Sequence, residues 1–199
     1  MNFPGIKKFF MIPIIILLTF YFILLVLLYL FQAKLLYFPS KIISLTPDAA
    51  GLIYEKVYLN TKDGVKINGW FIPKVNAKGI ILIFHGNGGN ISHCIERLKI
   101  FYELGYSSFI IDYRGYGESQ GEPDEEGTYI DAKSAWDYLI EKKNIKQENI
   151  IISGFSLGGS IASWLAKNTS PRALIIESTF TTINELAKKH FKIFPISFI

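Results

Sequence analysis

Three patterns of apolar and polar positions follow one another along the chain. Residues 9–31 form an unbroken run of 23 uncharged and mostly apolar side chains. Residues 53–72 alternate between apolar and polar side chains, with an Asp-Gly pair between their two halves. From residue 79 onward, short continuous apolar runs take turns with segments of helical periodicity. These patterns predict one long helix, a β-hairpin, and then buried strands alternating with helices.

The run at residues 9–31 is long enough to cross a membrane. As a helix it would be about 34 Å long, against a hydrocarbon core of ~30 Å. A cleaved secretory signal is the alternative, but its apolar core should be shorter and should end at small residues. This run instead continues into "YLFQAKLLYFP". We therefore expect an uncleaved, single-pass N-terminal anchor after a short segment at residues 1–8.

Positive charges lie on both sides of this run. Lys7, Lys8 and the α-amine precede it, and Lys34 and Lys41 follow it. The positive-inside rule places the more basic flank in the cytoplasm. The margin of one charge favours an extracytoplasmic position for the rest of the chain.

Charge and cysteine content narrow the possible partners. The 21 basic and 17 acidic residues give a net charge of +4, without a basic stripe. We therefore expect no nucleic-acid partner, and interpret the excess as surface lysines near a membrane. Cys94 is the only cysteine of the sequence, so an internal disulfide is excluded.

The order of elements after the connector at residues 32–52 predicts an α/β domain over residues 53–199. Strands that alternate with helices form a mostly parallel sheet with both faces covered, and sites lie at the carboxyl ends of its strands. After the hairpin, strands are expected at 79–86, 107–115, 149–154 and 172–178, and helices between Asn90 and Gly105 and at 125–143, 157–167 and 182–191.

The strongest candidate for chemistry is Ser156. It lies in "GFSLGG", where Gly154 and Gly158 complete the pattern G-x-S-x-G between a predicted strand and a predicted helix. Such a turn strains the central residue and needs flanking glycines because a Cβ would clash. The positive end of the helix would favour an oxyanion beside the serine hydroxyl. The alternative is a serine in a tight turn without chemistry.

The loop "HGNGGN" follows the strand at residues 79–86 and could supply a second oxyanion donor. By position we expect the backbone amides of Asn87 and Leu157 to be the pair. We expect His85 to shape this loop by packing or hydrogen bonding. The alternative is that the glycines only turn the chain. The loop lacks the third glycine of the dinucleotide-binding fingerprint.

Other titratable residues are given structural roles. Asp112 and Arg114 are expected to pair within their loop. His93 and Cys94 are adjacent on a predicted helix and point to different faces, so we expect no metal site there. His190 is expected on a solvated helix face.

Four motifs, "HGNGGN", "DYRGYGES", "GFSLGG" and "ESTFTTINELA", occur in the order and at the spacing of the α/β-hydrolase fold. The sequence most resembles its small membrane-anchored branch, related to serine aminopeptidases and to lipid and acyl-protein hydrolases. The resemblance implies that Ser156 is the nucleophile, that Asn87 and Leu157 hold the oxyanion, and that no cofactor or metal is needed.

In that family the chain order is serine, then acid, then histidine. Only about six of eight strands are predicted here, so the acid and histidine are expected after Ile199, within roughly 80–100 further residues. The interpretation is a membrane-anchored serine hydrolase that cleaves an ester, thioester or amide of an acyl-lipid or acyl-protein and here lacks two triad members. The alternative is a non-catalytic truncated product or an acyl-binding pseudoenzyme. The oligomeric state is not predicted.

Overall fold

The computed structural model describes residues 4–182 and 185. The chain divides into two units, and each is described by itself. The first contains helix α1, and the second is Tyr37–Ile183.

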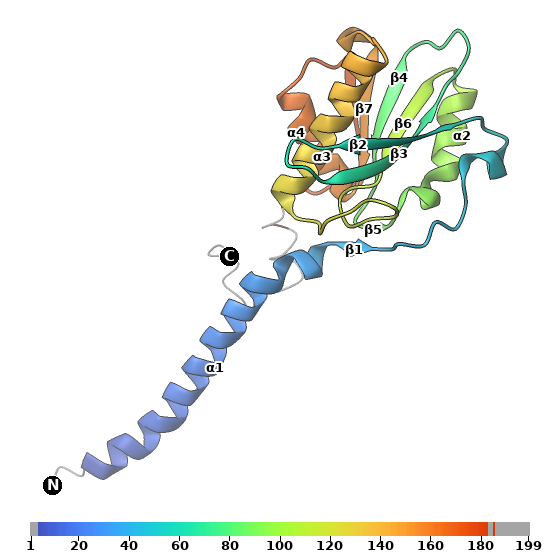
Figure 1. Ribbon diagram of the computed structural model, residues 1–199. Coiled ribbons are helices and arrows are strands. Elements are labelled where there is room, and N and C mark those ends of the chain that lie inside the picture. The colour runs from blue at the N-terminus through green and yellow to red at the C-terminus, as the bar shows by residue number, and fades with distance from the viewer. Residues whose placement is uncertain (1–3, 183–184, 186–199) are drawn as a thin grey trace. The chain divides into compact units, whose positions relative to one another are not determined.

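Helix α1, Pro4–Leu36, has 33 residues, and its part Met11–Leu36 is apolar and long enough to cross a membrane. It extends past the expected span of 9–31 at both ends (Figure 1). Residues 32–36, which the sequence pattern places in the connector, continue the helix. The sequence there, "QAKLL", consists of good helix formers, which explains the extension.

The second unit contains a six-stranded sheet in the order β2-β3-β6-β4-β7-β8. The β2–β3 and β3–β6 pairs are antiparallel, whereas β6, β4, β7 and β8 run parallel, as the alternation of elements predicted. The strands are β2 (Glu55–Asn60), β3 (Lys66–Ile72), β4 (Ile80–Phe84), β6 (Ser107–Ile111), β7 (Ile150–Phe155) and β8 (Ala173–Glu177).

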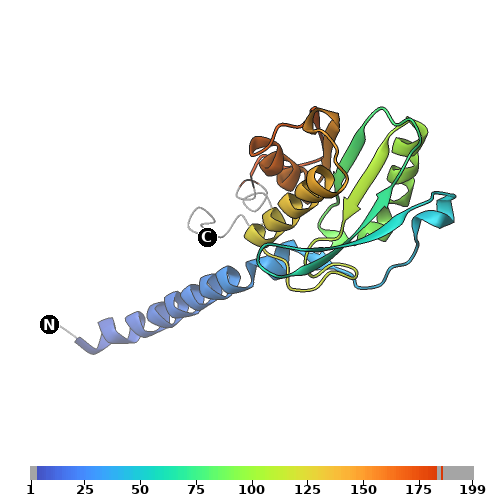
Figure 2. The ribbon, with the colours of Figure 1, turned by 45° about the horizontal axis from the view of Figure 1, so that its top comes forward.

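Helix α2 covers one face of this sheet, and α3 and α4 pack against each other on the opposite face (Figures 1 and 2). Asn90 caps the turn that leads into α2, because its side chain accepts a hydrogen bond from the Ser92 N–H. The helix expected at 182–191 lies almost entirely outside the described residues. The helical elements of this unit are η1 (Pro47–Ala50), η2 (Ile91–Cys94), α2 (Ile95–Glu103), α3 (Glu125–Asp137), η3 (Tyr138–Lys142), η4 (Gln147–Asn149) and α4 (Leu157–Lys167).

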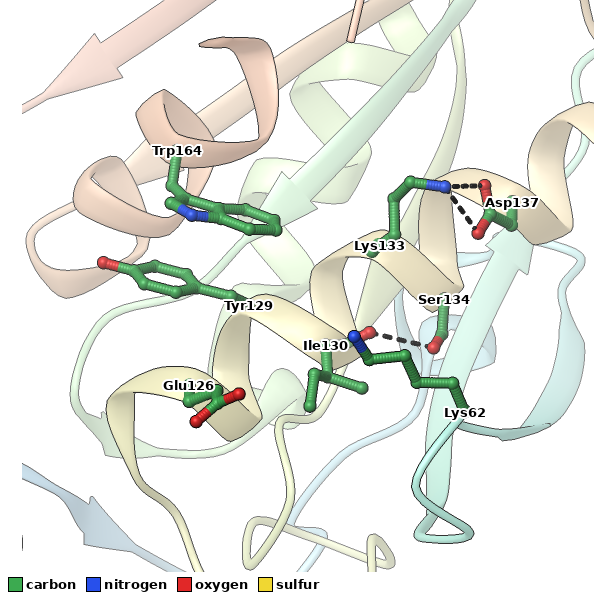
Figure 3. A pocket seen from close by; sticks show the side chains of 8 residues that line it. All are labelled: Lys62, Glu126, Tyr129, Ile130, Lys133, Ser134, Asp137 and Trp164. Carbon is green, nitrogen blue, oxygen red and sulfur yellow. Dashed lines mark hydrogen bonds and ion pairs between the residues drawn. The ribbon is translucent and has the colours of Figure 1, made fainter. Parts of the chain in front are cut away.

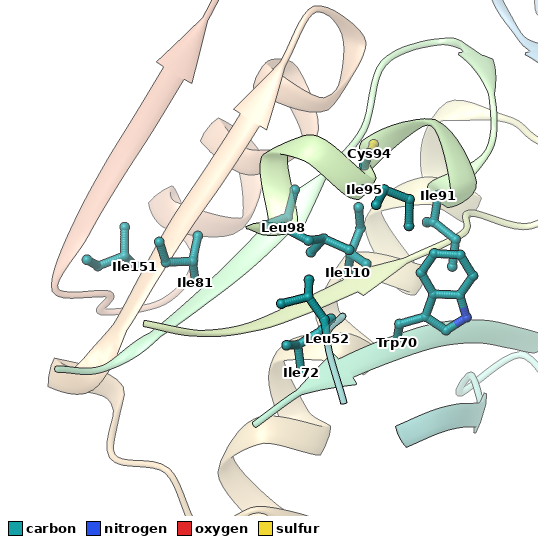
Figure 4. Packing of buried hydrophobic residues seen from close by; sticks show 11 residues of the cluster. Leu52, Trp70, Ile72, Ile81, Ile91, Cys94, Ile95, Leu98, Ile110 and Ile151 are labelled. Atoms are coloured by element: carbon teal, nitrogen blue, oxygen red, sulfur yellow. The ribbon is translucent and has the colours of Figure 1, made fainter. Parts of the chain in front are cut away.

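The central strand β4 is buried along its whole length, which explains its continuous apolar sequence. Ile81 and Ile83 belong to the cluster that packs under α2, and Figure 4 shows Ile81 in it. Because side chains alternate along a strand, Leu82 and Phe84 face α3 and α4 instead. Burial of each such side chain contributes about 2 kcal/mol to folding. This core holds the carboxyl ends of the parallel strands in fixed positions.

A second, two-stranded sheet fastens the connector to the loop that follows β4. Strand β1 (Phe38–Pro39) runs parallel to β5 (Gly88–Gly89). The Phe38 N–H donates to the Asn87 carbonyl at 2.9 Å, and the Ser40 N–H donates to the Gly89 carbonyl at 2.9 Å. The connector therefore supports the loop that is expected to supply an oxyanion donor.

Candidate active site

Ser156 is the single residue between the end of β7 and the start of α4, with φ 52° and ψ −123°. A positive φ strains the backbone of a serine. Its neighbours hold it there: the Ser156 N–H donates to the Glu177 carbonyl at 3.0 Å, and the Ser156 carbonyl accepts from Thr179 Oγ1 at 2.7 Å. The sequence prediction of a strained strand-to-helix turn agrees with this geometry.

The glycines on either side of Ser156 have no room for a side chain. A Cβ on Gly158 would overlap the carbonyl oxygen of Phe84, and a Cβ on Gly154 would overlap that of Gly158. Helix α4 therefore begins directly against β7 and β4. This close packing leaves Ser156 half-buried at the carboxyl edge of the sheet.

The loop after β4 passes beside Ser156. The register of the parallel pair places Phe84 opposite Gly154, so the residues that follow meet at the same edge. A Cβ built on Gly86 would lie 3.6 Å from the Cβ of Ser156. Leu157 is the first residue of α4 and belongs to the first turn, whose N–H groups lack an acceptor within the helix. The structure thus places Gly86, the residue before Asn87, and Leu157 beside the serine.

His85 is buried next to this loop, with 1% of its surface exposed. Its Nδ1 lies 2.7 Å from the Gly86 carbonyl oxygen, and its Nε2 lies 3.6 Å from Asp112 Oδ1. Burial lowers the pKa of His85 to about 4, so the ring is neutral at pH 7. A neutral ring that donates from Nδ1 to Gly86 holds the loop, as expected, and offers no base to Ser156.

The expected pairing of Asp112 with Arg114 is wrong. Asp112 is fully buried and accepts from the Ile91 N–H at 2.9 Å, and burial raises its pKa to about 7. Arg114 instead donates to Asp63 at 2.8 Å and to Asp131 at 2.9 Å. The chain turns after β6, so the two side chains leave toward different elements.

Among the described residues, the other titratable candidates form no second catalytic or metal site. Burial raises the pKa of the Cys94 thiol to about 12, and within residues 4–182 and 185 no group of three or more histidines, cysteines or acids could hold a metal. Glu177, at the end of β8, pairs with Arg97 at 2.8 Å, and this hydrogen-bonded ion pair lowers the pKa of its carboxyl group. His190 lies outside the described residues.

A cavity of about 290 Å³ lies over α3 and α4 (Figure 3). Tyr129 and Trp164 stack in it with ring centroids 4.5 Å apart, and Lys62 reaches it from the β2–β3 turn. A second hollow, of about 420 Å³, is lined by residues around Gly79 and Asn149. Neither hollow is lined by Ser156, so neither is a substrate pocket for it.

The family model of the alpha/beta hydrolase fold matches residues 79–195, more than half of the 199 residues. The strand order and the serine turn described above agree with that match. The chain belongs to the α/β-hydrolase family.

Three curated relatives are similar over most of this chain. WAV2 of Arabidopsis thaliana, an alpha/beta hydrolase domain-containing protein, is 40% identical over 79% of this chain and 54% of its own. The membrane protein YNL320W of Saccharomyces cerevisiae is 37% identical over 71% and 51%. The lysophosphatidylserine lipase ABHD12 of Rattus norvegicus is 36% identical over 80% and 48%. The chain spans about half the length of these relatives.

Among solved structures, the esterase Pf2001 of Pyrococcus furiosus superposes with a TM-score of 0.66 at 23% identity. The match covers 79% of this chain and 63% of the esterase. At this identity the likeness shows the fold alone.

Proposed function

We propose that this chain carries the nucleophile and the oxyanion loop of a membrane-anchored serine hydrolase. The observation that carries the proposal is the strained Ser156 turn, held between β7 and α4 with Gly86 packed beside it. A protein gains nothing in stability by placing a serine at φ 52°, whereas catalysis gains an accessible hydroxyl next to two backbone donors.

In the proposed reaction, Ser156 Oγ attacks the carbonyl carbon of an ester, thioester or amide while its proton passes to a general base. The amides of Asn87 and Leu157 bind the carbonyl oxygen as it becomes an oxyanion. The tetrahedral intermediate expels the alcohol, thiol or amine, which takes the proton from the base. Water then attacks the acyl-serine in the same way and restores Ser156.

The general base of this proposal lies outside the described residues. The His85 ring is buried, donates from Nδ1 to Gly86, and has its Nε2 turned to Asp112. The ring of His93 packs against Gly89 in the next loop turn. In an α/β-hydrolase the chain order is serine, then acid, then histidine, so the histidine and the acid follow the serine in the sequence. The rival proposal, an acyl-binding pseudoenzyme, needs no such histidine.

The proposed substrates are acyl-lipids or acylated proteins at a membrane surface. Helix α1 is long and apolar enough to anchor the chain, and the relative YNL320W is named a membrane protein. The relative ABHD12 is named a lysophosphatidylserine lipase, which favours a lipid ester. The one-charge bias around the helix favours an extracytoplasmic site.

The test of the nucleophile is covalent labelling with a fluorophosphonate probe. We expect the whole natural protein that contains these residues to label at one serine and the Ser156→Ala variant not to label. Ser163→Ala is the matched control, because Ser163 lies on the same helix and its hydroxyl donates to the Gly159 carbonyl. Labelling that survives Ser156→Ala would refute the assignment of the nucleophile, and a wild type that does not label would favour the pseudoenzyme.

A separate measurement tests the position of the base. Residues 1–199 by themselves are expected not to label at neutral pH, because a serine without a base is a weak nucleophile. Labelling at the rate of the whole protein, unchanged by His190→Ala, would show that the base lies among the described residues.

A further inference from the structure

The peptide unit between Gly86 and Asn87 contains both the acceptor of the His85 hydrogen bond and the expected oxyanion donor. Its carbonyl oxygen, on Gly86, accepts the hydrogen bond from His85 Nδ1 at 2.7 Å. Its N–H, on Asn87, is the expected oxyanion donor. The described chain has no cis peptide bond, and in a trans peptide unit the C=O and the N–H point in opposite directions. The direction of one therefore fixes the direction of the other.

We propose that His85 is a positioning residue, whose ring N–H fixes the Gly86–Asn87 peptide so that the Asn87 N–H faces the oxyanion formed at Ser156. The inference rests on the proposed role of Ser156. In this role the buried His85 ring orients the Asn87 N–H and takes no part in proton transfer. Without the ring, rotation of one peptide unit would turn the donor away from the serine.

The ring itself is held in place. It packs against Tyr113 in a tilted arrangement with ring centroids 4.3 Å apart, and its contact with Tyr116 is T-shaped with centroids 5.1 Å apart. The Tyr113 hydroxyl donates to the His85 carbonyl at 2.8 Å, and the Tyr116 hydroxyl donates to the Asn87 carbonyl at 2.7 Å. Hydrogen bonds thus fix the peptide units on both sides of the Gly86–Asn87 unit, and His85 fixes the unit between them.

The charge state of the ring suits this role. Because a carbonyl oxygen only accepts, the neutral ring carries its hydrogen on Nδ1. The groups that face it are Asp112 from the end of β6, the phenols of Tyr113 and Tyr116, and the more distant ring of His93. Burial keeps the pKa of His85 at about 4, so the same donor persists through neutral pH.

The first measurement does not depend on activity. In the full chain in detergent, the nitrogen NMR spectrum of the His85 ring should show the Nδ1–H form. The amide signal of Asn87 should shift in His85→Leu and return toward wild type in His85→Asn, whose side-chain amide can replace the Nδ1 donor. Ile81→Val, a core change near the start of the same strand β4, should leave that signal in place. A wild-type ring that carries its hydrogen on Nε2 would overturn the inference whether or not the variant folds. An Asn87 signal that does not move in a folded His85→Leu variant would overturn it as well.

The second measurement is the rate of fluorophosphonate labelling in the whole natural protein. We expect His85→Leu to lower the maximal labelling rate at least about tenfold, with little change in probe affinity, since loss of an oxyanion donor costs about 100-fold or more. His85→Asn should recover most of the rate, and Ile81→Val should match wild type. Equal rates in wild type and His85→Leu would overturn the inference.

An unlabelled wild type would instead refute the proposed function, while the NMR result would still decide whether His85 orients the peptide.

Discussion

At the scale of single residues, Ser156 stores strain that the surrounding hydrogen bonds hold. A sparsely populated backbone conformation at positive φ costs a residue with a Cβ about 1–3 kcal/mol, and glycine adopts positive φ with almost no penalty. The free energy of unfolding should therefore respond to the Cβ at this position and not only to the hydroxyl.

We expect Ser156→Gly to be about 1 kcal/mol more stable than Ser156→Ala, although both lack the proposed nucleophile. Urea unfolding of the full chain in mild detergent measures the difference. Equal stability of the two variants would mean that the turn is not strained.

Burial of Asp112 and His85 predicts opposite dependences of stability on pH. The pKa of Asp112 rises from 3.8 to about 7, so between these values the folded protein binds more protons there and loses stability as pH rises. The pKa of His85 falls from 6.5 to about 4, so between these values the unfolded chain binds more protons and stability increases with pH. In the wild type the two contributions partly cancel.

Replacing Asp112 by asparagine should remove the contribution of Asp112 to the pH dependence of stability. The Asp112→Asn variant keeps a side-chain oxygen for the Ile91 N–H but has no group that titrates. We expect the stability of the variant relative to wild type to increase from pH 4 to pH 7, measured by urea unfolding at several pH values. Ser108→Ala, a buried change without a titrating group, should give a difference that is constant with pH. A constant difference for Asp112→Asn as well would mean that burial does not raise the pKa of Asp112.

At the scale of elements, Arg114 joins three parts of the domain. From the loop after β6 it reaches Asp63 in the β2–β3 turn and Asp131 on α3, and Asp131 is fully buried. Removing the guanidinium would leave a buried carboxylate without its cation, which is one of the costly changes in a protein.

We expect Arg114→Met to lower the free energy of unfolding by about 3 kcal/mol. The control is Lys133→Met, which breaks the exposed pair with Asp137 and should cost less than about 0.5 kcal/mol. Losses of similar size in the two variants would show that the Arg114 cluster is no more important than a surface ion pair.

The sequence predicted those elements whose pattern is local. The start of α4 at Leu157 follows from the serine turn, and the burial of β4 follows from its apolar run. It could not predict the pairing of Phe38 with Gly88, because a two-residue bridge has no periodicity. The partners of Arg114 lie far along the chain, and only the folded structure brings them together. The Nδ1 contact of His85 was missed in detail for a related reason: a sequence shows which groups are present and not which way a ring points.

At the scale of the whole molecule, the edge strand β8 is the least protected part of the described sheet. All five of its residues are exposed, including Leu174, Ile175 and Ile176. Ile176 lies on the side of α4, near Gly159, and Ile175 therefore points to the opposite face. Exposed apolar edge strands pair with other chains.

We expect residues 1–199 to self-associate in detergent and Ile175→Lys to reduce this association severalfold, as measured by light scattering. Val75→Lys is the control, because Val75 is also apolar and 87% exposed but lies in a loop. Equal effects of the two substitutions would mean that added charge, and not the edge of β8, controls association.

The strand order also determines when the parts of the domain can be joined during synthesis. Strand β6 lies between β3 and β4, although both are made before it. The hairpin and β4 are therefore synthesised before β6, the strand that pairs with both β3 and β4. Their edges stay unpaired until Ile111, the last residue of β6, has been added. The serine turn forms later still, once β7 has joined the other edge of β4. Helix α1 needs no partner strand, so translation delivers this apolar helix before any strand of the six-stranded sheet, and Ser156 only after five of those six strands.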